Sequence, residues 1–189
     1  MATRGVATLF NRLILKIERE AIESFEYAGD VVDLGCGTAG YRDFIRRSGA
    51  RYTGVDWAHS LHGTDSADIV ADLTADFPLE SECADVVTAF QVLEHIPNPA
   101  HFLSECERLL RPGGRLFLTT PFMCHIHEAP HDYYRFTRYG LAHLVTQAGL
   151  TVETIEESTG FWHTWVLKFN YHETLRTPRL WTLTRRMHS

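Results

Sequence analysis

The sequence lacks three features that would assign it to common classes of protein. No apolar run approaches the roughly 18 residues of a membrane-spanning helix, so we expect no helix that spans a membrane. The formal net charge of −6 at pH 7 leaves no general positive field of the kind that nucleic-acid binding uses. Internal repeats and low-complexity segments are absent as well. These absences favour a soluble globular protein that does not bind nucleic acid.

Cysteine is scarce, and its positions are scattered. The four cysteines form no CxxC pair and are Cys36, Cys83, Cys106 and Cys124. In the first 15 residues, Asn11 and Arg12 interrupt the apolar stretch and no small-residue cleavage site is present, so we expect no secretory signal. Reduced thiols and a cytoplasmic location are therefore predicted.

The length of 189 residues suits a single domain with a sizeable core. We expect a leading helix within 1–28, a core over 29–157, and a lid or C-terminal extension over 158–189. Apolar residues at spacings of three and four predict an amphipathic helix between Val6 and Phe25.

Short apolar runs alternate with glycine turns and with helical spacing through the core. We expect strands at 31–34, 52–55, 68–71, 84–90, 114–120 and 150–155. Helices are expected after Gly40, over 100–110, and from Thr137 as N-cap to Gly149. Strands separated by helices favour a mostly parallel sheet covered on both faces. The predicted fold class is therefore a doubly wound α/β fold.

The sharpest motif is a glycine-rich turn between the first strand and its helix, and it reads DLGCGTAG over 33–40. Gly35 and Gly37 permit a sharp turn and the close approach of a ligand, because they have no Cβ. This spacing alone also fits an NAD-dependent oxidoreductase. Asp33 favours another ligand, since a carboxylate there suits a cationic amino acid and repels a pyrophosphate.

Further polar residues stand where predicted strands end, the edge at which open α/β sheets bind ligands. Asp56 closes the second strand, where a carboxylate can accept hydrogen bonds from both ribose hydroxyls. Asp72, with Leu73 beside it, follows the third strand, where an adenine edge can donate to a carboxylate. Gln91 follows the fourth strand. A plain turn role for Asp56 stays open as the alternative.

Four segments within residues 31–122 match one known family in order: VVDLGCGTAG, YTGVD, VADLTADFPLESECADVVTAFQVLEHIPNP and LLRPGGRLFLTTPF. Through them the chain resembles the class I methyltransferases, specifically the subgroup related to the ubiquinone and menaquinone methyltransferases. The resemblance implies a Rossmann-like methyltransferase fold and S-adenosylmethionine as cofactor. It assigns Asp33, Gly35 and Gly37 to the methionine part of the cofactor and Asp56 to the ribose. Asp72 and Leu73 are assigned to the adenine, and Gln91 to the wall beside the sulfonium. Cys36 and Trp57, which adjoin these residues, complete the predicted cofactor-binding set.

The chain departs from the family pattern at two places. Family members usually carry glycine at the position of Ala39, whereas here the glycine follows at Gly40, and we expect binding with a shifted loop. The family's sheet also ends with an antiparallel seventh strand. No convincing apolar strand follows Ile155, so we expect this strand to be missing or formed poorly by 180–183.

The segment 121–136 follows the fifth strand, is rich in His, Tyr and acidic residues, and resembles the PHDYYRFT segment of many family members. We expect it to lie over the methyl-donor pocket. Transfer to a hydroxyl requires a base, and imidazole suits that task. The catalytic candidates are His131, Asp132 as an orienting group or alternate base, and His95. A capping role for His95 and pairing of Asp132 with Arg135 are the alternatives.

The same segment also raises the question of a metal. His125, His127, Glu128 and His131 offer nitrogen and oxygen ligands within seven residues. This set lacks a second, distant group of ligands, so we expect no metal, and a metal site stays the less favoured alternative.

The function that these patterns favour is methyl transfer from S-adenosylmethionine to a small or lipid-linked acceptor, at oxygen. The alternatives are a non-catalytic module that binds S-adenosylmethionine and, less favoured, the NAD-dependent oxidoreductase. The aromatic residues Trp162, Trp165 and Phe169 fall on one helical face, which predicts a lid or a peripheral contact with a membrane. The sequence indicates no oligomeric state.

Overall fold

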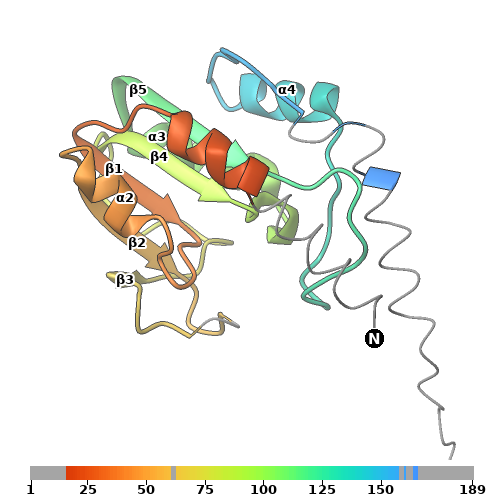
Figure 1. The fold of residues 1–189 in the computed structure, drawn as a ribbon, viewed down its shortest axis with the longest axis horizontal. Helices are drawn as coiled ribbons and strands as arrows, with labels where there is room; N and C mark the ends of the chain where they lie inside the picture. Colours follow the sequence, from red (N-terminus) through yellow and green to blue (C-terminus); the bar gives the residue numbers. More distant parts are fainter. Residues whose placement is uncertain (1–15, 61–62, 158–159, 161–163, 166–189) are drawn as a thin grey trace, which may run out of the picture. The chain divides into compact units, whose positions relative to one another are not determined.

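The computed structural model describes residues 16–60, 63–157, 160 and 164–165 (Figure 1). The chain divides into two units, Glu26–Ile155 and a second unit made of Met1–Phe25 with Glu156–Ser189. Of the second unit, the structure describes a helix over 16–24, which lies within the segment predicted as the leading helix. Most of the predicted lid and the weak strand at 180–183 lie outside the described residues.

The unit Glu26–Ile155 is built on a five-stranded parallel sheet with the order β3-β2-β1-β4-β5 (Figure 1). The strands are β1 Asp30–Leu34, β2 Arg51–Asp56, β3 Ile69–Val70, β4 Ala84–Phe90 and β5 Leu110–Thr119. The chain runs outward from β1 to β3 and then returns to β4, so the strand order reverses between β1 and β4. This confirms the predicted doubly wound fold and places its ligand-binding edge at the carboxyl ends of these strands.

Helices cover both faces of the sheet, as the nearly continuous apolar runs of β1 and β4 require. These helices are α2 Arg42–Arg47, the 3-10 helix η1 Leu93–His95, α3 Pro99–Leu109 and α4 Arg138–Gln147. Successive side chains of β1 alternate between faces, and Val32 and Leu34 join the core cluster that contains Phe102 and Leu103 of α3. Val31 and Asp33 point to the other face, where α2 lies (Figure 1). None of the described helices is long and apolar enough to cross a membrane.

The predicted start of α4 is confirmed. Thr137 is the N-cap, and its hydroxyl accepts a hydrogen bond from the backbone N–H of Gly140 at 3.0 Å. Gly149 follows the helix with a φ of +91°, the left-handed conformation that ends many helices.

The prediction of a strand at 150–155 is wrong. These residues form no strand, and Arg115 of β5 reaches Glu153 through a side-chain ion pair of 3.0 Å instead of a backbone ladder. The half-buried residues here are Leu150, Val152 and Ile155, and a strand cannot turn all three to one face because its side chains alternate.

The start of β5 also differs from the prediction. The strand begins at Leu110 instead of Gly114, and its register to β4 shifts between the pairs Ala84 with Leu110 and Val86 with Arg115. The residues Pro112 to Gly114 therefore form a bulge within the strand instead of a separate turn before it.

The connection between β3 and β4, over 71–83, contains no helix, and side chains of α3 hold it in place. The buried carboxylate of Glu105 accepts a hydrogen bond from the backbone N–H of Phe77 at 2.8 Å. Arg108 pairs with Glu105 and donates to the carbonyl oxygens of Phe77 and Leu79 at 3.1 and 2.9 Å. These contacts satisfy backbone groups that a helix would otherwise pair within itself.

Replacing Glu105 with alanine is expected to lower the free energy of unfolding by about 2–3 kcal/mol, because a buried N–H and the Arg108 guanidinium lose their acceptor. Urea denaturation measures this change. Glu107→Ala on the exposed side of the same helix is the control and should stay within about 0.5 kcal/mol of the wild type. Equal stabilities of the two variants would contradict the role given to Glu105.

Candidate cofactor and acceptor site

The carboxyl edge of the sheet brings together the acids that the sequence analysis selected. Asp33 lies in β1, Asp56 ends β2, and Asp72 follows β3 by two residues. Strands β1 and β2 pair in register, with Asp33 opposite Gly54. The three carboxylates therefore stand on neighbouring parallel strands, at the edge where a doubly wound sheet binds its ligand.

Asp33 is buried beneath the glycine turn. Its Oδ2 accepts a hydrogen bond from the hydroxyl of Tyr52 at 2.6 Å, and its Oδ1 accepts one from Thr88 at 2.7 Å. Burial raises the pKa of Asp33 to about 6, although both hydrogen bonds oppose this shift. Each carboxylate oxygen retains a second lone pair, so the side chain can still attract a cationic group. Tyr52 and Thr88 lie within the matched segments but were not among the predicted site residues.

The glycine turn has the geometry that requires its glycines. Gly35 has a φ of +70°, and a Cβ there would lie 2.4 Å from Cγ2 of Val92. Gly37 has a φ of +53°, and its N–H donates to Oδ2 of Asp56 at 2.9 Å. The other oxygen of Asp56 accepts from the N–H of Trp57 at 2.7 Å. Asp56 thus holds the turn against β2, so the turn role that stood as the alternative is present.

The backbone conformation at residue 39 explains why family members usually carry glycine there. Ala39 has a φ of +52°, in the left-handed region where glycine has no steric penalty. Gly40 needs no such freedom, since its φ is not in that region and a Cβ would meet no atom within 4 Å. Residue 39 thus has a backbone conformation that glycine adopts without a steric penalty, and Ala39 adopts it with some strain.

The other expected cofactor residues differ in accessibility. Asp72 is exposed, and its carboxylate accepts hydrogen bonds from the N–H and hydroxyl of Thr74 at 2.9 and 2.7 Å. Leu73 is buried in the core cluster, so its side chain is turned away from solvent. Gln91 has a φ of +56° and donates from Nε2 to the hydroxyl of Thr119 at 3.1 Å. Burial raises the pKa of the Cys36 thiol to about 12, which keeps it protonated.

The segment 121–136 folds back onto η1. The N–H groups of Tyr133 and Tyr134 both donate to the carbonyl oxygen of Glu94, at 2.9 and 3.3 Å. Nδ1 of His95 lies 2.7 Å from the carbonyl oxygen of His131. A carbonyl oxygen only accepts, so Nδ1 of His95 carries a proton, and in the neutral ring the lone pair is on Nε2.

The predicted catalytic residues of this segment occupy distinct surroundings. Asp132 is 2% exposed and accepts two hydrogen bonds from Arg135, at 2.6 and 2.8 Å, and one from the N–H of His127 at 2.9 Å. Arg135 holds the pKa of Asp132 well below its usual range, so this carboxylate is a poor base. The ion pair of Asp132 with Arg135, the alternative to a catalytic role, is present in the structure. The exposed ring of His131 lies edge to face with Trp57, 5.2 Å between centroids.

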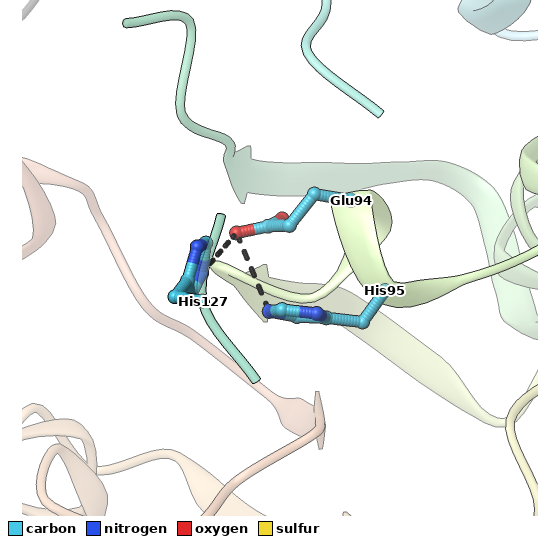
Figure 2. Close-up of side chains that lie close together, drawn as sticks. All are labelled: Glu94, His95 and His127. Atoms are coloured by element: carbon cyan, nitrogen blue, oxygen red, sulfur yellow. Dashed lines mark ion pairs between the residues drawn. The ribbon is translucent and has the colours of Figure 1, made fainter. Parts of the chain in front are cut away.

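Glu94 is a further residue of this region that was not among the predicted site residues. Its side chain is fully buried, and burial raises its pKa to about 7. Nε2 of His95 and Nε2 of His127 lie 3.8 and 3.9 Å from its Oε1 (Figure 2). The only signal in the sequence was its place between Gln91 and His95, just beyond the end of β4.

Comparison with known proteins agrees with this geometry. A family described as "Methyltransferase domain" matches residues 32–118. The ubiquinone biosynthesis O-methyltransferase of Burkholderia thailandensis is 33% identical over 158 residues, which cover 68% of this chain and 67% of that protein. The protein of the same name from Xanthomonas oryzae pv. oryzae is 36% identical over 107 residues, 48% of this chain and 42% of that protein. The chain thus spans two thirds or less of these relatives.

Solved structures show the same fold at low identity. A methyltransferase from Mesorhizobium loti superimposes with a TM-score of 0.62 at 18% identity, over 82% of this chain and 90% of that one. A methyltransferase from Aquifex aeolicus superimposes with a TM-score of 0.61 at 16% identity, over 82% of this chain and 92% of that one. Fold and site thus define a Rossmann-like protein of the class that uses S-adenosylmethionine.

The chain belongs to the class I S-adenosylmethionine-dependent methyltransferases, in the subgroup related to the ubiquinone methyltransferases. Its cofactor is S-adenosylmethionine, and the oxidoreductase alternative is set aside. The donor set fits this cofactor, because carboxylates surround a turn whose glycines leave room for a ligand. Which residues hold each part of the cofactor stays a prediction.

Ala39→Gly is expected to raise the free energy of unfolding by about 1 kcal/mol, because glycine adopts the left-handed conformation without strain. Gly40→Ala is the matched variant and should leave stability unchanged or slightly higher. Denaturant titration of both variants checks the assignment. A destabilised Ala39→Gly variant would show that residue 39 is not left-handed.

The raised pKa of Asp33 predicts a pH dependence of ligand binding. Above about pH 6 the carboxylate is ionised and attracts the ammonium group of S-adenosylhomocysteine; below it the neutral acid does not. We expect affinity to fall by up to about tenfold per pH unit as the pH decreases below 6. Calorimetry between about pH 5 and 8 measures this, and Asp33→Asn should bind weakly without that dependence. A wild-type affinity that is constant over this range would contradict the prediction.

Proposed function

We propose that the protein transfers a methyl group from S-adenosylmethionine to a hydroxyl oxygen of a small-molecule acceptor. The observation that carries the proposal is the contact between the segment 121–136 and the carboxyl edge of the sheet. His131 packs against Trp57, the residue after Asp56, while its carbonyl oxygen accepts from His95 beyond β4. An acceptor held beneath this segment would lie beside the residues expected to bind the cofactor.

The proposed cofactor contacts follow from charge and position. Asp33 attracts the ammonium group, Asp56 accepts from the ribose hydroxyls, and Asp72 accepts from the adenine edge. Gln91, Cys36 and Trp57 line the site, and Leu73 contributes through its backbone because its side chain is turned into the core. Bound S-adenosylmethionine would supply an electrophilic methyl group: the acceptor oxygen would bond to this carbon in line as the carbon–sulfur bond breaks, and the sulfur would leave as the neutral thioether of S-adenosylhomocysteine.

His131 is the proposed base that takes the proton of the acceptor hydroxyl. Its Nδ1 lies 3.4 Å from the hydroxyl of Tyr133, which can orient the ring. His95 becomes a positioning residue, because its Nδ1–H holds the backbone of His131. Asp132 orients the segment through Arg135 and His127 instead of accepting a proton.

Transfer at oxygen draws support from the relatives whose names state that they are O-methyltransferases. A lipid-linked acceptor, with a peripheral membrane contact, is the second version of the proposal. It is favoured by three exposed apolar side chains at the start of the segment: Phe122, Met123 and Ile126.

Four free cysteines are compatible with the reducing conditions of a cytoplasmic location.

The first test is calorimetric titration with S-adenosylmethionine and S-adenosylhomocysteine, with NADH as control ligand. We expect micromolar binding of both adenosyl ligands and none of NADH. Asp72→Ala should weaken binding about tenfold through loss of the adenine contact, whereas Glu80→Ala, an exposed acid of the same connection, should not. Absence of adenosyl binding in the folded wild type would overturn the cofactor site.

The second test measures transfer of a labelled methyl group to a panel of phenolic and lipid-linked hydroxyl compounds. His131→Ala should reduce kcat by about 100-fold or more, with unchanged affinity for S-adenosylhomocysteine. His125→Ala, a neighbouring histidine, is the control. Cofactor binding without transfer to any acceptor would favour the non-catalytic module instead, and flotation with liposomes distinguishes the membrane version from the small-molecule version.

A further inference from the structure

A fully buried carboxylate oxygen near the proposed acceptor site has no hydrogen-bond partner. Glu94 is 0% exposed, and among the described residues its Oε1 accepts no hydrogen bond. The other oxygen, Oε2, accepts a long hydrogen bond of 3.5 Å from the hydroxyl of Thr120. Leaving such a group unpaired in the interior is costly, so the structure calls for a donor or a cation at this point.

Two imidazole nitrogens surround this oxygen. Nε2 of His95 lies 3.8 Å and Nε2 of His127 lies 3.9 Å from Oε1 of Glu94, and Figure 2 shows both rings turned toward the carboxylate. These distances are too long for hydrogen bonds. The three ligand atoms lie within 4.8 Å of one another. The histidines come from separate parts of the chain, η1 and the segment after β5.

The tautomers leave lone pairs directed at the centre of this cluster. Nδ1 of His95 donates to the carbonyl oxygen of His131, so in the neutral ring the lone pair is on Nε2. For His127, Nη2 of Arg135 uses both of its N–H groups on Asp132 and His125, at 2.8 and 2.9 Å.

Nδ1 of His127 lies 3.4 Å from Nη2 of Arg135, whose two N–H groups have these shorter contacts, and 3.3 Å from the carbonyl oxygen of His125, which can only accept. When Nδ1 donates to this carbonyl oxygen, the lone pair of the neutral ring is on Nε2, which faces Glu94. Second contacts of this kind orient the histidine ligands of metal sites.

The spacing and the charge suit a small divalent ion. Ligand bonds of about 2.0–2.2 Å in a tetrahedral site separate the ligand atoms by about 3.4 Å. The observed 3.8 and 3.9 Å exceed this by about half an ångström, and all three ligand atoms lie within 4.8 Å of one another, so side-chain rotations would bring them to bonding distance of one ion. Oε2 of Glu128 lies 3.9 Å from Nε2 of His95 and offers a fourth ligand. The nearby Arg135 is neutralised by its ion pair with Asp132.

We propose that Glu94, His95 and His127 bind one divalent transition-metal ion of the zinc class, with Glu128 as an additional ligand. Two imidazoles and one carboxylate favour such an ion over Mg²⁺, which prefers oxygen ligands. The ion joins the segment 121–136 to the end of β4. This ligand set replaces the less favoured one of the sequence analysis, because it includes the distant group, Glu94 and His95, that the earlier set lacked. Metal binding does not depend on the proposed methyl transfer.

The test is titration of the untagged, chelator-treated protein with Zn²⁺ and with Mg²⁺ by calorimetry, with the metal content measured by mass spectrometry. We expect one Zn²⁺ per chain at micromolar concentration or tighter, and Mg²⁺ binding weaker by at least about 100-fold. Thermal unfolding should shift upward with Zn²⁺, since a ligand of the native state stabilises it. A folded protein that binds no Zn²⁺, or binds Mg²⁺ equally well, overturns the proposal.

Variants identify the ligands. Glu94→Gln keeps the shape of the buried side chain, and His127→Gln changes only a half-buried residue of the segment, so one remains informative if the other fails to fold. Each should weaken Zn²⁺ binding by at least about 100-fold. His125→Ala, two residues from His127, is the matched control and should bind as the wild type does. Unchanged binding in both ligand variants, or loss of binding in His125→Ala, overturns this ligand set.

Discussion

The buried carboxylate of Asp33 connects the three central strands on which the rest of the structure depends. It lies in β1 and accepts hydrogen bonds from Tyr52 of β2 and Thr88 of β4. Since β1 is also the strand after which the chain turns through Gly35, this one group ties the sheet to the beginning of the glycine turn. Its raised pKa is the consequence of placing a carboxylate in the core, and a cationic ligand would offset that cost.

A second constraint acts at the same edge of the sheet. The turn at Gly37 is held by Asp56, while the segment 121–136 is held by the backbone and side chains of η1. Both sets of contacts come from residues just beyond the ends of parallel strands. The doubly wound topology therefore assembles the acids expected to bind the cofactor and the histidines of the segment within one region, although these residues are far apart in the sequence.

Sequence patterns were reliable where local chemistry decides the conformation. The N-cap of α4 at Thr137 is an example, because it depends on a side chain three residues from its partner. Sequence patterns were unreliable where contacts between residues distant in the sequence decide the conformation. The run 150–155 has strand-like composition, but it forms no strand with any of the residues that the structure describes. Glu94 gave little sign of its role, because the partners that surround it, His127 above all, become neighbours only when the segment folds back.

The sequence by itself determined the fold class, the family and the cofactor, since these depend on a glycine turn, on acids at strand ends and on the order of short motifs along the chain. Only the tertiary structure decided which role each of these side chains has. Asp132 became a partner of Arg135, Asp56 became the support of the glycine turn, and Glu94 became the centre of a histidine cluster. The physical reason is that burial and charge pairing act between segments distant in sequence, and these interactions set the protonation and orientation of each group.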